Sequence, residues 1–151
     1  MRTSVTAPAD YPELHFSPAV LDEILPLRHA VLRPGFPERS AIFDGDDLES
    51  TQHFAAIANG QIVSCLSLYA AEWTNKPARQ LRGMATAGNL QRRGIGRQLL
   101  SFAVDPRVLH WCNARVEAIG FYAKAGWTVE SEPFEIPTVG PHVKMLRLPQ
   151  P

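Results

Sequence analysis

The chain has 151 residues, of which 45% are hydrophobic and 20% are charged. Lys and Arg together number 15, as do Asp and Glu, so the formal net charge at pH 7 is zero. This balance argues against a general nucleic-acid binder, which needs a basic excess, and the length predicts one globular domain over residues 1–151 that can bury a full core.

Three local features bear on the compartment. The opening MRTSVTAPADYPEL has no apolar run typical of a signal peptide, so we expect a cytoplasmic protein. The longest stretch without Asp, Glu, Lys or Arg, Ser50–Ala71, is interrupted by Asn59-Gly60 and does not predict a membrane span. Cys65 and Cys112 lie in apolar runs without metal-ligand spacing, so we expect buried free thiols and no metal site.

The chain begins with a predicted strand followed by a predicted helix. Pro12–Phe16 reads as a short strand. The helix is expected to be capped by Ser17, with Pro18 in its first turn, and to end before Pro34. Pro26 lies inside this helix, so we expect a break or a kink there.

A long loop and a hairpin follow. Phe36–Gln52 is polar and rich in turn residues, which is typical of a loop. Two apolar runs within His53–Glu72 flank Asn59 and Gly60, the pair that favours a two-residue type I′ hairpin turn. Thr74–Arg79 is expected to be another loop.

The second half alternates strands and helices, which predicts a mixed α/β domain with at least one right-handed crossover. Gly126 provides a C-terminal cap for the last helix. The expected elements are strand Gln80–Thr86, helix Gly94–Val104, strand Arg107–Arg115, helix Val116–Trp127, strand Thr128–Phe134, loop Glu135–Pro141 and strand His142–Leu148.

The start of the helix in QRRGIGRQLLSFAV has the composition of an anion site. Gly94 and Gly96 leave backbone N–H groups uncovered in a turn where they have no intrahelical partner. Arg92, Arg93 and Arg97 add positive charge, so the stretch predicts a phosphate or pyrophosphate site. Close packing of helix against strand is the alternative role for the glycines. The Rossmann and P-loop patterns are both incomplete here.

Two motifs carry a resemblance to a family. MATAGNLQRRGIGRQLL resembles the acyl-CoA-binding signature of the GNAT acyltransferase superfamily, Gln/Arg-x-x-Gly-x-Gly/Ala, which is filled by Gln91, Arg92, Arg93, Gly94, Ile95 and Gly96. FYAKAGW, Phe121–Trp127, is similar to the second landmark of that family, a Tyr-x-x-x-Gly-Phe run. The resemblance covers most of the chain and implies an acyl-CoA N-acyltransferase fold, with a mixed central sheet of about six to seven strands flanked by helices.

The resemblance implies an N-acetyltransferase that uses acetyl-CoA as co-substrate and acetylates the amine of a small molecule or a peptide. It implies no metal and no nucleic-acid or membrane partner, and it allows a homodimer. Met84, Ala85 and Thr86 are expected to pair with the pantetheine arm, and the amides of Arg92–Arg97 to hold the pyrophosphate. A non-catalytic acyl-CoA-binding sensor on the same fold is the rival hypothesis.

The resemblance also suggests catalytic groups. Tyr122 stands where many relatives have a tyrosine that protonates the departing thiolate, although a core aromatic would fit too. Glu72 and His53 are the candidate bases; a solvated carboxylate and a structural histidine are the alternatives. Arg115 replaces an asparagine common in relatives, which puts that contact in doubt, and it is expected to contact CoA or substrate.

Charged side chains before the hairpin allow two interpretations. The acidic run Asp44, Asp46 and Asp47 is expected to form a solvated turn, or to attract a cationic amine. Arg28 and Arg33 on the first helix are expected to be solvated or salt-bridged, or to bind a substrate carboxylate.

Overall fold

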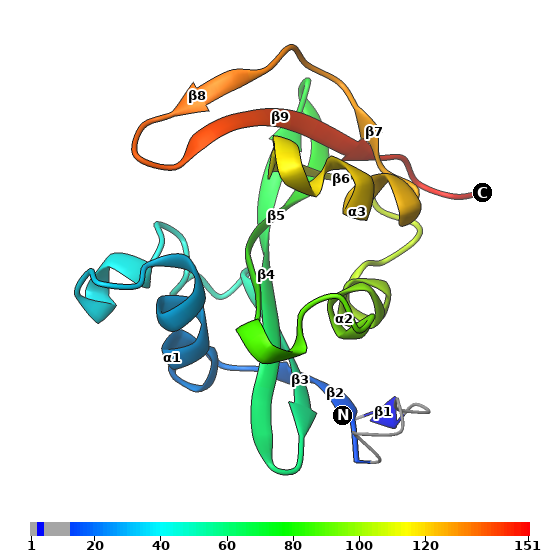
Figure 1. Cartoon of the computed structure of the whole chain (residues 1–151). Helices are drawn as coiled ribbons and strands as arrows, with labels where there is room; N and C mark the ends of the chain where they lie inside the picture. The colour runs from blue at the N-terminus through cyan, green and yellow to red at the C-terminus, as the bar shows by residue number, and fades with distance from the viewer. Residues whose placement is uncertain (1–2, 5–12) are drawn as a thin grey trace. The chain divides into compact units, whose positions relative to one another are not determined.

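A computed structural model of the chain describes residues 3–4 and 13–151 (Figure 1). The chain divides into two compact units, Met1–Tyr69 with Gly83–Ala103, and Ala70–Arg82 with Val104–Pro151. Strands β4 (Gln61–Trp73) and β5 (Lys76–Thr86) pass from one unit into the other.

The first unit has an antiparallel arrangement of strands, in the order β1 (Thr3–Ser4), β2 (His15–Ala19), β3 (Gln52–Ala58) and the first part of β4. The turn between β3 and β4 is formed by Asn59 and Gly60, which have φ angles of 51° and 78°. The two-residue hairpin turn is therefore confirmed, because a type I′ turn needs positive φ at both of its central residues.

Two helices pack on opposite faces of these strands: α1 (Leu21–Leu32) and α2 (Ile95–Ala103) (Figure 1). Ile24 of α1 belongs to a buried cluster with Ala55 of β3. The ring of Phe102 on α2 lies 6.1 Å from that of Phe54, centroid to centroid. Neighbouring strand residues point to opposite faces, so this alternation places one helix on each side.

The start of α1 differs from the prediction. Ser17 and Pro18 lie in β2, where they pair with β3, and the helix begins only at Leu21. Glu23 caps it instead, because its carboxylate accepts the N–H of Val20 at 2.9 Å. Pairing with a neighbouring strand therefore outweighs the local capping signal. Pro12, which was predicted to open the strand, lies outside the described residues.

Pro26 does not interrupt α1, which continues to Leu32 and ends before Pro34 as predicted. Proline removes one i→i−4 hydrogen bond, here the bond to the carbonyl of Asp22. Both Pro26 and Asp22 are exposed, so water can satisfy that carbonyl group. The long loop that follows contains one short 3₁₀ turn, η1 (Glu38–Ala41).

In the second unit, the strands run in the order β5, β6, β9 and β7, and β8 also pairs with β9. β5 and β6 pair in parallel, and the other pairs are antiparallel. The elements are β6 (His110–Arg115), the 3₁₀ turn η3 (Val116–Ala118), α3 (Ile119–Lys124), β7 (Thr128–Val129), β8 (Phe134–Ile136) and β9 (Gly140–Arg147).

Several predicted boundaries in this unit were wrong. The expected loop Thr74–Arg79 is a two-residue turn, Thr74 and Asn75 with φ of 47° and 67°, after which β5 begins. The expected strand Thr128–Phe134 is split between β7 and β8. Strand ends depend on the neighbouring strand, which local composition does not reveal. The predicted cap at Gly126 is confirmed by its φ of 93°.

The mixed α/β class is confirmed. Among the described residues there are nine strands, seven of which are three residues or longer: β2, β3, β4, β5, β6, β8 and β9. The predicted helix Gly94–Val104 is α2, one residue shorter at each end.

His110, in the second unit, should make the stability of the protein depend on pH. Its side chain is fully buried, and burial lowers the pKa of the imidazole, assisted by Arg79 and Arg147 and opposed by the hydrogen bond to the Val108 carbonyl. The folded state thus prefers neutral His110, whereas the unfolded chain takes up a proton near pH 6.5.

We therefore expect the free energy of unfolding to fall as the pH drops below about 6.5. His110→Asn, whose amide can donate to the same Val108 carbonyl but does not titrate, should show a flatter pH dependence. Urea unfolding of both proteins between about pH 5 and 7.5 measures this. Parallel curves for the two proteins would contradict the assignment.

Candidate active site

The N-terminus of α2 presents main-chain donors. The first hydrogen bond of the helix joins the N–H of Gln98 to the carbonyl oxygen of Gly94 at 3.1 Å, so Gly94 is the capping residue. The N–H groups of Ile95, Gly96 and Arg97 then have no partner within the helix. Because Gly94 has no side chain, it cannot cap these donors as Ser or Asp would.

The same turn is rich in positive charge. Arg92, Arg93 and Arg97 are all exposed. Arg92 and Gly94 have φ of 66° and 84°, which curls the chain just before the helix. Free amides, the positive end of the helix dipole and exposed guanidinium groups suit a phosphate or diphosphate. Gln91–Arg97 therefore fits the phosphate-bearing part of a nucleotide-like co-substrate.

The end of β5 lies beside this turn, within the first unit. The Nε2 group of Gln91 donates to the carbonyl of Thr86 at 3.1 Å. Met84–Thr86 lie beyond the part of β5 that pairs with β6, which is Arg79–Leu81. The structure therefore brings two of the predicted cofactor-binding segments together, the strand Met84–Thr86 and the turn Gln91–Arg97.

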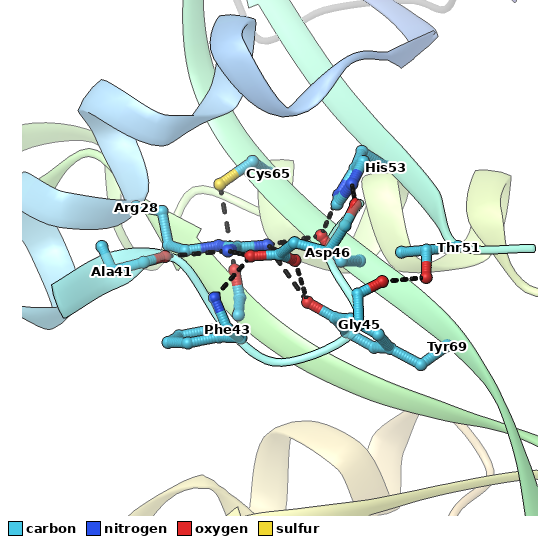
Figure 2. A network of polar contacts seen from close by, with 11 residues as sticks. Arg28, Ala41, Phe43, Gly45, Asp46, Thr51, His53, Cys65 and Tyr69 are labelled. Carbon is cyan, nitrogen blue, oxygen red and sulfur yellow. Dashed lines mark hydrogen bonds and ion pairs between the residues drawn. The ribbon is translucent and has the colours of Figure 1, made fainter. Parts of the chain in front are cut away.

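A buried ion pair lies at the centre of the first unit (Figure 2). Nη1 of Arg28 donates to the Asp46 carboxylate at 2.6 Å and to the Ala41 carbonyl at 2.9 Å. Nη2 of Arg28 donates to Oγ of Ser67 at 2.8 Å. The Tyr69 hydroxyl and the main-chain N–H of Phe43 also donate to Asp46. We call Arg28, Asp46, His53, Ser67 and Tyr69 the buried network.

Both members of this pair are charged. Burial opposes the charge of Asp46, but hydrogen bonds from Arg28, Tyr69 and Phe43 outweigh it, so the pKa of the carboxyl is lowered. Burial also opposes the charge of Arg28, and the hydrogen bond with Asp46 outweighs it, so the pKa of the guanidinium is raised. The expectation that Asp46 lies in a solvated turn was wrong, whereas Arg28 is salt-bridged, one of its expected states.

His53, a predicted base, belongs to the buried network. Its Nε2 faces the main-chain carbonyl of Asp46 at 3.0 Å and so carries the proton. Its Nδ1 lies 2.6 Å from Oγ of Ser67, whose hydroxyl donates to it. Both ring nitrogens are thus engaged, which gives His53 the hydrogen-bond pattern of a structural histidine, the alternative considered for it.

Ser67, Tyr69 and Gly83 were not identified from the sequence. Ser67 and Tyr69 are ordinary residues of a buried strand and carry no signal. Gly83 did have one, because a glycine inside a strand pattern suggests a bulge or a close backbone approach. Arg28 had another: it follows the buried Ile24 by four residues, on the same helix face.

The remaining predicted residues belong to the second unit. Tyr122 of α3 is buried, and burial raises the pKa of its phenol. Its ring lies 5.4 Å from that of Trp127, so it also packs in the core. Glu72 on β4 and Arg115 at the end of β6 are exposed. Asn113, two residues before Arg115, accepts a hydrogen bond from Lys144 at 3.1 Å.

The two cysteines, Cys65 and Cys112, are free and buried, as predicted. Burial raises the pKa of both thiols to about 12. Neither therefore forms a thiolate nucleophile near neutral pH.

Two findings concern side-chain clusters and helices within residues 3–4 and 13–151. This part of the chain contains no group of three or more His, Cys, Asp or Glu side chains placed to hold a metal ion. None of its helices is long and apolar enough to cross a membrane.

The acetyltransferase (GNAT) domain family matches residues 49–129. The chain is 30% identical over 135 residues to an uncharacterized N-acetyltransferase, YitI, of Bacillus subtilis (strain 168); the match covers 84% of this chain and 91% of that protein.

Solved structures share the fold. An acyl-CoA N-acyltransferase from Pseudomonas aeruginosa is 19% identical with a TM-score of 0.73, covering 90% of this chain and 100% of that one. A GNAT family acetyltransferase from Elizabethkingia anophelis with acetyl-CoA bound is 16% identical with a TM-score of 0.63, covering 89% and 97%.

Proposed function

Because the chain belongs to the GNAT acetyltransferase family and is an acyltransferase by that membership, we propose that it transfers an acetyl group from acetyl-CoA to an amine. The observation that carries this proposal is the start of α2, where three main-chain N–H groups follow a capping glycine among exposed arginines. An acyl-CoA needs such donors for its diphosphate.

The residues proposed to bind acetyl-CoA lie in the first unit. The amides of Ile95, Gly96 and Arg97 hold the diphosphate, and the neighbouring arginines add charge-assisted contacts. Met84–Thr86, joined to the same turn through Gln91, offer main-chain groups to the pantetheine arm. The acetyl-CoA seen with the Elizabethkingia anophelis enzyme supports this choice of co-substrate.

The reaction needs two proton transfers. An ammonium group has no lone pair, so the acceptor must first lose a proton. Glu72 suits that role because its carboxylate is exposed, whereas the lone pair of His53 is already engaged. Tyr122 suits the role of acid, because its phenol is protonated near neutral pH and can donate to a departing thiolate. Burial raises the pKa of the phenol, which keeps it protonated but makes it a weaker acid.

Tyr122→Phe tests the acid. We expect kcat to fall about 100-fold or more, because the departing thiolate loses its proton donor, while the affinity for CoA changes little. The ring, and with it the packing on Trp127, is retained. Steady-state kinetics with calorimetric titration of CoA separates the two quantities.

Urea unfolding provides the control for Tyr122→Phe, because activity lost through unfolding would say nothing about the role of the hydroxyl group. An unchanged kcat in a folded variant would leave Tyr122 as a core aromatic only. If kcat fell only in proportion to weaker CoA binding, Tyr122 would not be the general acid.

The proposed function itself is tested by mixing the protein with acetyl-CoA and a panel of amines. The panel contains polyamines, amino acids, aminoglycosides and short peptides with free amino groups. We expect faster cleavage of the thioester, followed by its ultraviolet absorbance, with at least one amine. CoA binding without transfer to any amine would favour the sensor, and no binding at all would refute the acetyl-CoA proposal.

A further inference from the structure

The buried network lies against one residue of β5, Gly83. A Cβ atom built on Gly83 would lie 2.9 Å from Nε of Arg28 and 3.3 Å from its Cζ. Real Cβ atoms essentially never come that close, so the guanidinium occupies the space that a side chain would need. The Gly83 carbonyl oxygen also lies 3.9 Å from Sγ of Cys65 on β4.

Gly83 also sets the path of the strand. Its φ is +70°, a left-handed conformation inside an otherwise extended element. A residue with positive φ redirects the peptide groups that follow it, and the next three residues are Met84–Thr86. Whatever fixes Gly83 therefore fixes the direction of the main-chain groups proposed to face the pantetheine arm.

Stability is a poor explanation for a pair buried this deeply. Arg28 is 0% exposed and Asp46 is 4% exposed. Replacing a buried ion pair by apolar residues of similar size often leaves a protein equally stable, because the desolvation cost of the charges disappears. A geometric role is a better explanation, because a planar guanidinium with several fixed partners has one allowed position.

The partners of Arg28 fix that position. Four of its N–H groups are directed to Ala41, Asp46 and Ser67, and the Phe43 ring lies 4.4 Å from its Cζ. Nε, which is buried, has no hydrogen-bond partner and is the atom nearest to the place that a Cβ of Gly83 would take. The loop between α1 and β3, together with strand β4, thus holds the guanidinium in place, and the guanidinium packs against Gly83.

From this juxtaposition we infer that Arg28 is a positioning residue for acyl transfer, acting through the main chain of Gly83 on Met84–Thr86. Asp46 and Ser67 hold it in place. This inference rests on the proposed function, since it assigns the strand a role in binding the acyl-CoA.

Ser67→Ala is the mild test, because it leaves the ion pair intact. It removes one hydrogen bond to Arg28 and the one that the Ser67 hydroxyl donates to His53. We expect kcat to fall about tenfold, as small misplacements of reacting groups cost large factors in rate. The Kd for CoA should rise by a smaller factor than kcat falls, because the amides of Ile95, Gly96 and Arg97 are untouched and only the contacts with the pantetheine arm are disturbed. The amide resonances of Met84–Thr86 should shift in two-dimensional NMR spectra.

Arg28→Met combined with Asp46→Leu is the strong test. This apolar pair avoids an unpaired buried charge, so it should still fold. Its urea midpoint should be lower than that of the wild type, because the Ala41 carbonyl, the Phe43 N–H and the Tyr69 hydroxyl lose a partner. We expect kcat to fall about 100-fold. Thr51→Val is the matched control: it removes a hydrogen bond within the same loop, to the Gly45 carbonyl, without touching Arg28. Its kcat and its strand resonances should remain as in the wild type.

Wild-type kcat in the apolar pair or in Ser67→Ala would overturn the inference. An equal loss in Thr51→Val would overturn it too, because general loosening of the loop would then be the cause. If the wild type neither binds CoA nor transfers acetyl, the proposed function has failed instead. The resonances of Met84–Thr86 in Ser67→Ala, recorded without any ligand, still decide whether Arg28 acts on the strand.

Discussion

Gly96→Glu should weaken CoA binding about 10²–10³-fold, the largest effect that we expect on affinity. Gly96 lies in the first turn of α2 and has no positive φ, so a side chain there does not strain the backbone. The glutamate would place a negative charge among the amides that we propose to hold the diphosphate. Repulsion between charges about 4 Å apart is worth a few kcal/mol near a protein surface. Isothermal titration with CoA measures the loss.

Two further variants make this result specific. Gly96→Ala adds only a methyl group and should stabilise α2 by about 0.5–1 kcal/mol while still weakening CoA binding. Lys76→Glu makes a larger charge change at an exposed residue outside the turn, and should leave the affinity nearly unchanged. Undiminished CoA affinity in Gly96→Glu would place the diphosphate elsewhere and remove the main support for the acetyl-CoA proposal.

Gly83→Ala should lower the free energy of unfolding by about 2–5 kcal/mol, the largest single-residue loss of stability that we expect. The left-handed conformation costs a non-glycine residue about 1–2 kcal/mol. The added methyl group would also press on the guanidinium of Arg28, and forcing extra atoms into a packed site costs about 1–3 kcal/mol. Chemical denaturation measures the total.

Gly60→Ala separates the two causes, because Gly60 has a similar φ of 78° but no atom within 4 Å of the place that a Cβ would take. It should cost only the conformational part, about 1–2 kcal/mol. Equal losses at the two positions would mean that the contact with Arg28 is soft and that Gly83 is needed for its backbone alone.

Local signals predicted the elements whose causes are local. Asn59-Gly60 identified its turn because only a few residue types tolerate two successive positive φ angles. Ser17 and Pro18 gave a wrong prediction of where α1 begins. Both residues suit the start of a helix, but here they pair with β3, a strand that lies far along the chain. Thr74 and Asn75 form a turn of the same size as Asn59-Gly60. This turn was not predicted, because it lacks the glycine that usually marks such a turn in a sequence.

The same distinction applies to the candidate site. The glycines and arginines of Gln91–Arg97 lie within one turn, where the glycines leave backbone amides uncovered and the arginines add charge, so the sequence alone predicted an anion site there. The contact of Arg28 with Asp46, Ser67 and Gly83 joins segments that are distant in sequence, and no pattern in a single sequence pairs them. Arg28 was consequently predicted only to be solvated, paired or substrate-binding.

The burial of Cys65 and Cys112 has a practical consequence for enzymology. Ellman's reagent reacts with thiolates, and neither cysteine supplies one at neutral pH, because the pKa of each is raised to about 12. Colour that develops in a continuous assay of the native protein should therefore come from a released thiol product, which under the acetyl-CoA proposal is CoA. Turnover can be followed even at enzyme concentrations comparable to those of the product, which suits slow reactions with poor acceptors.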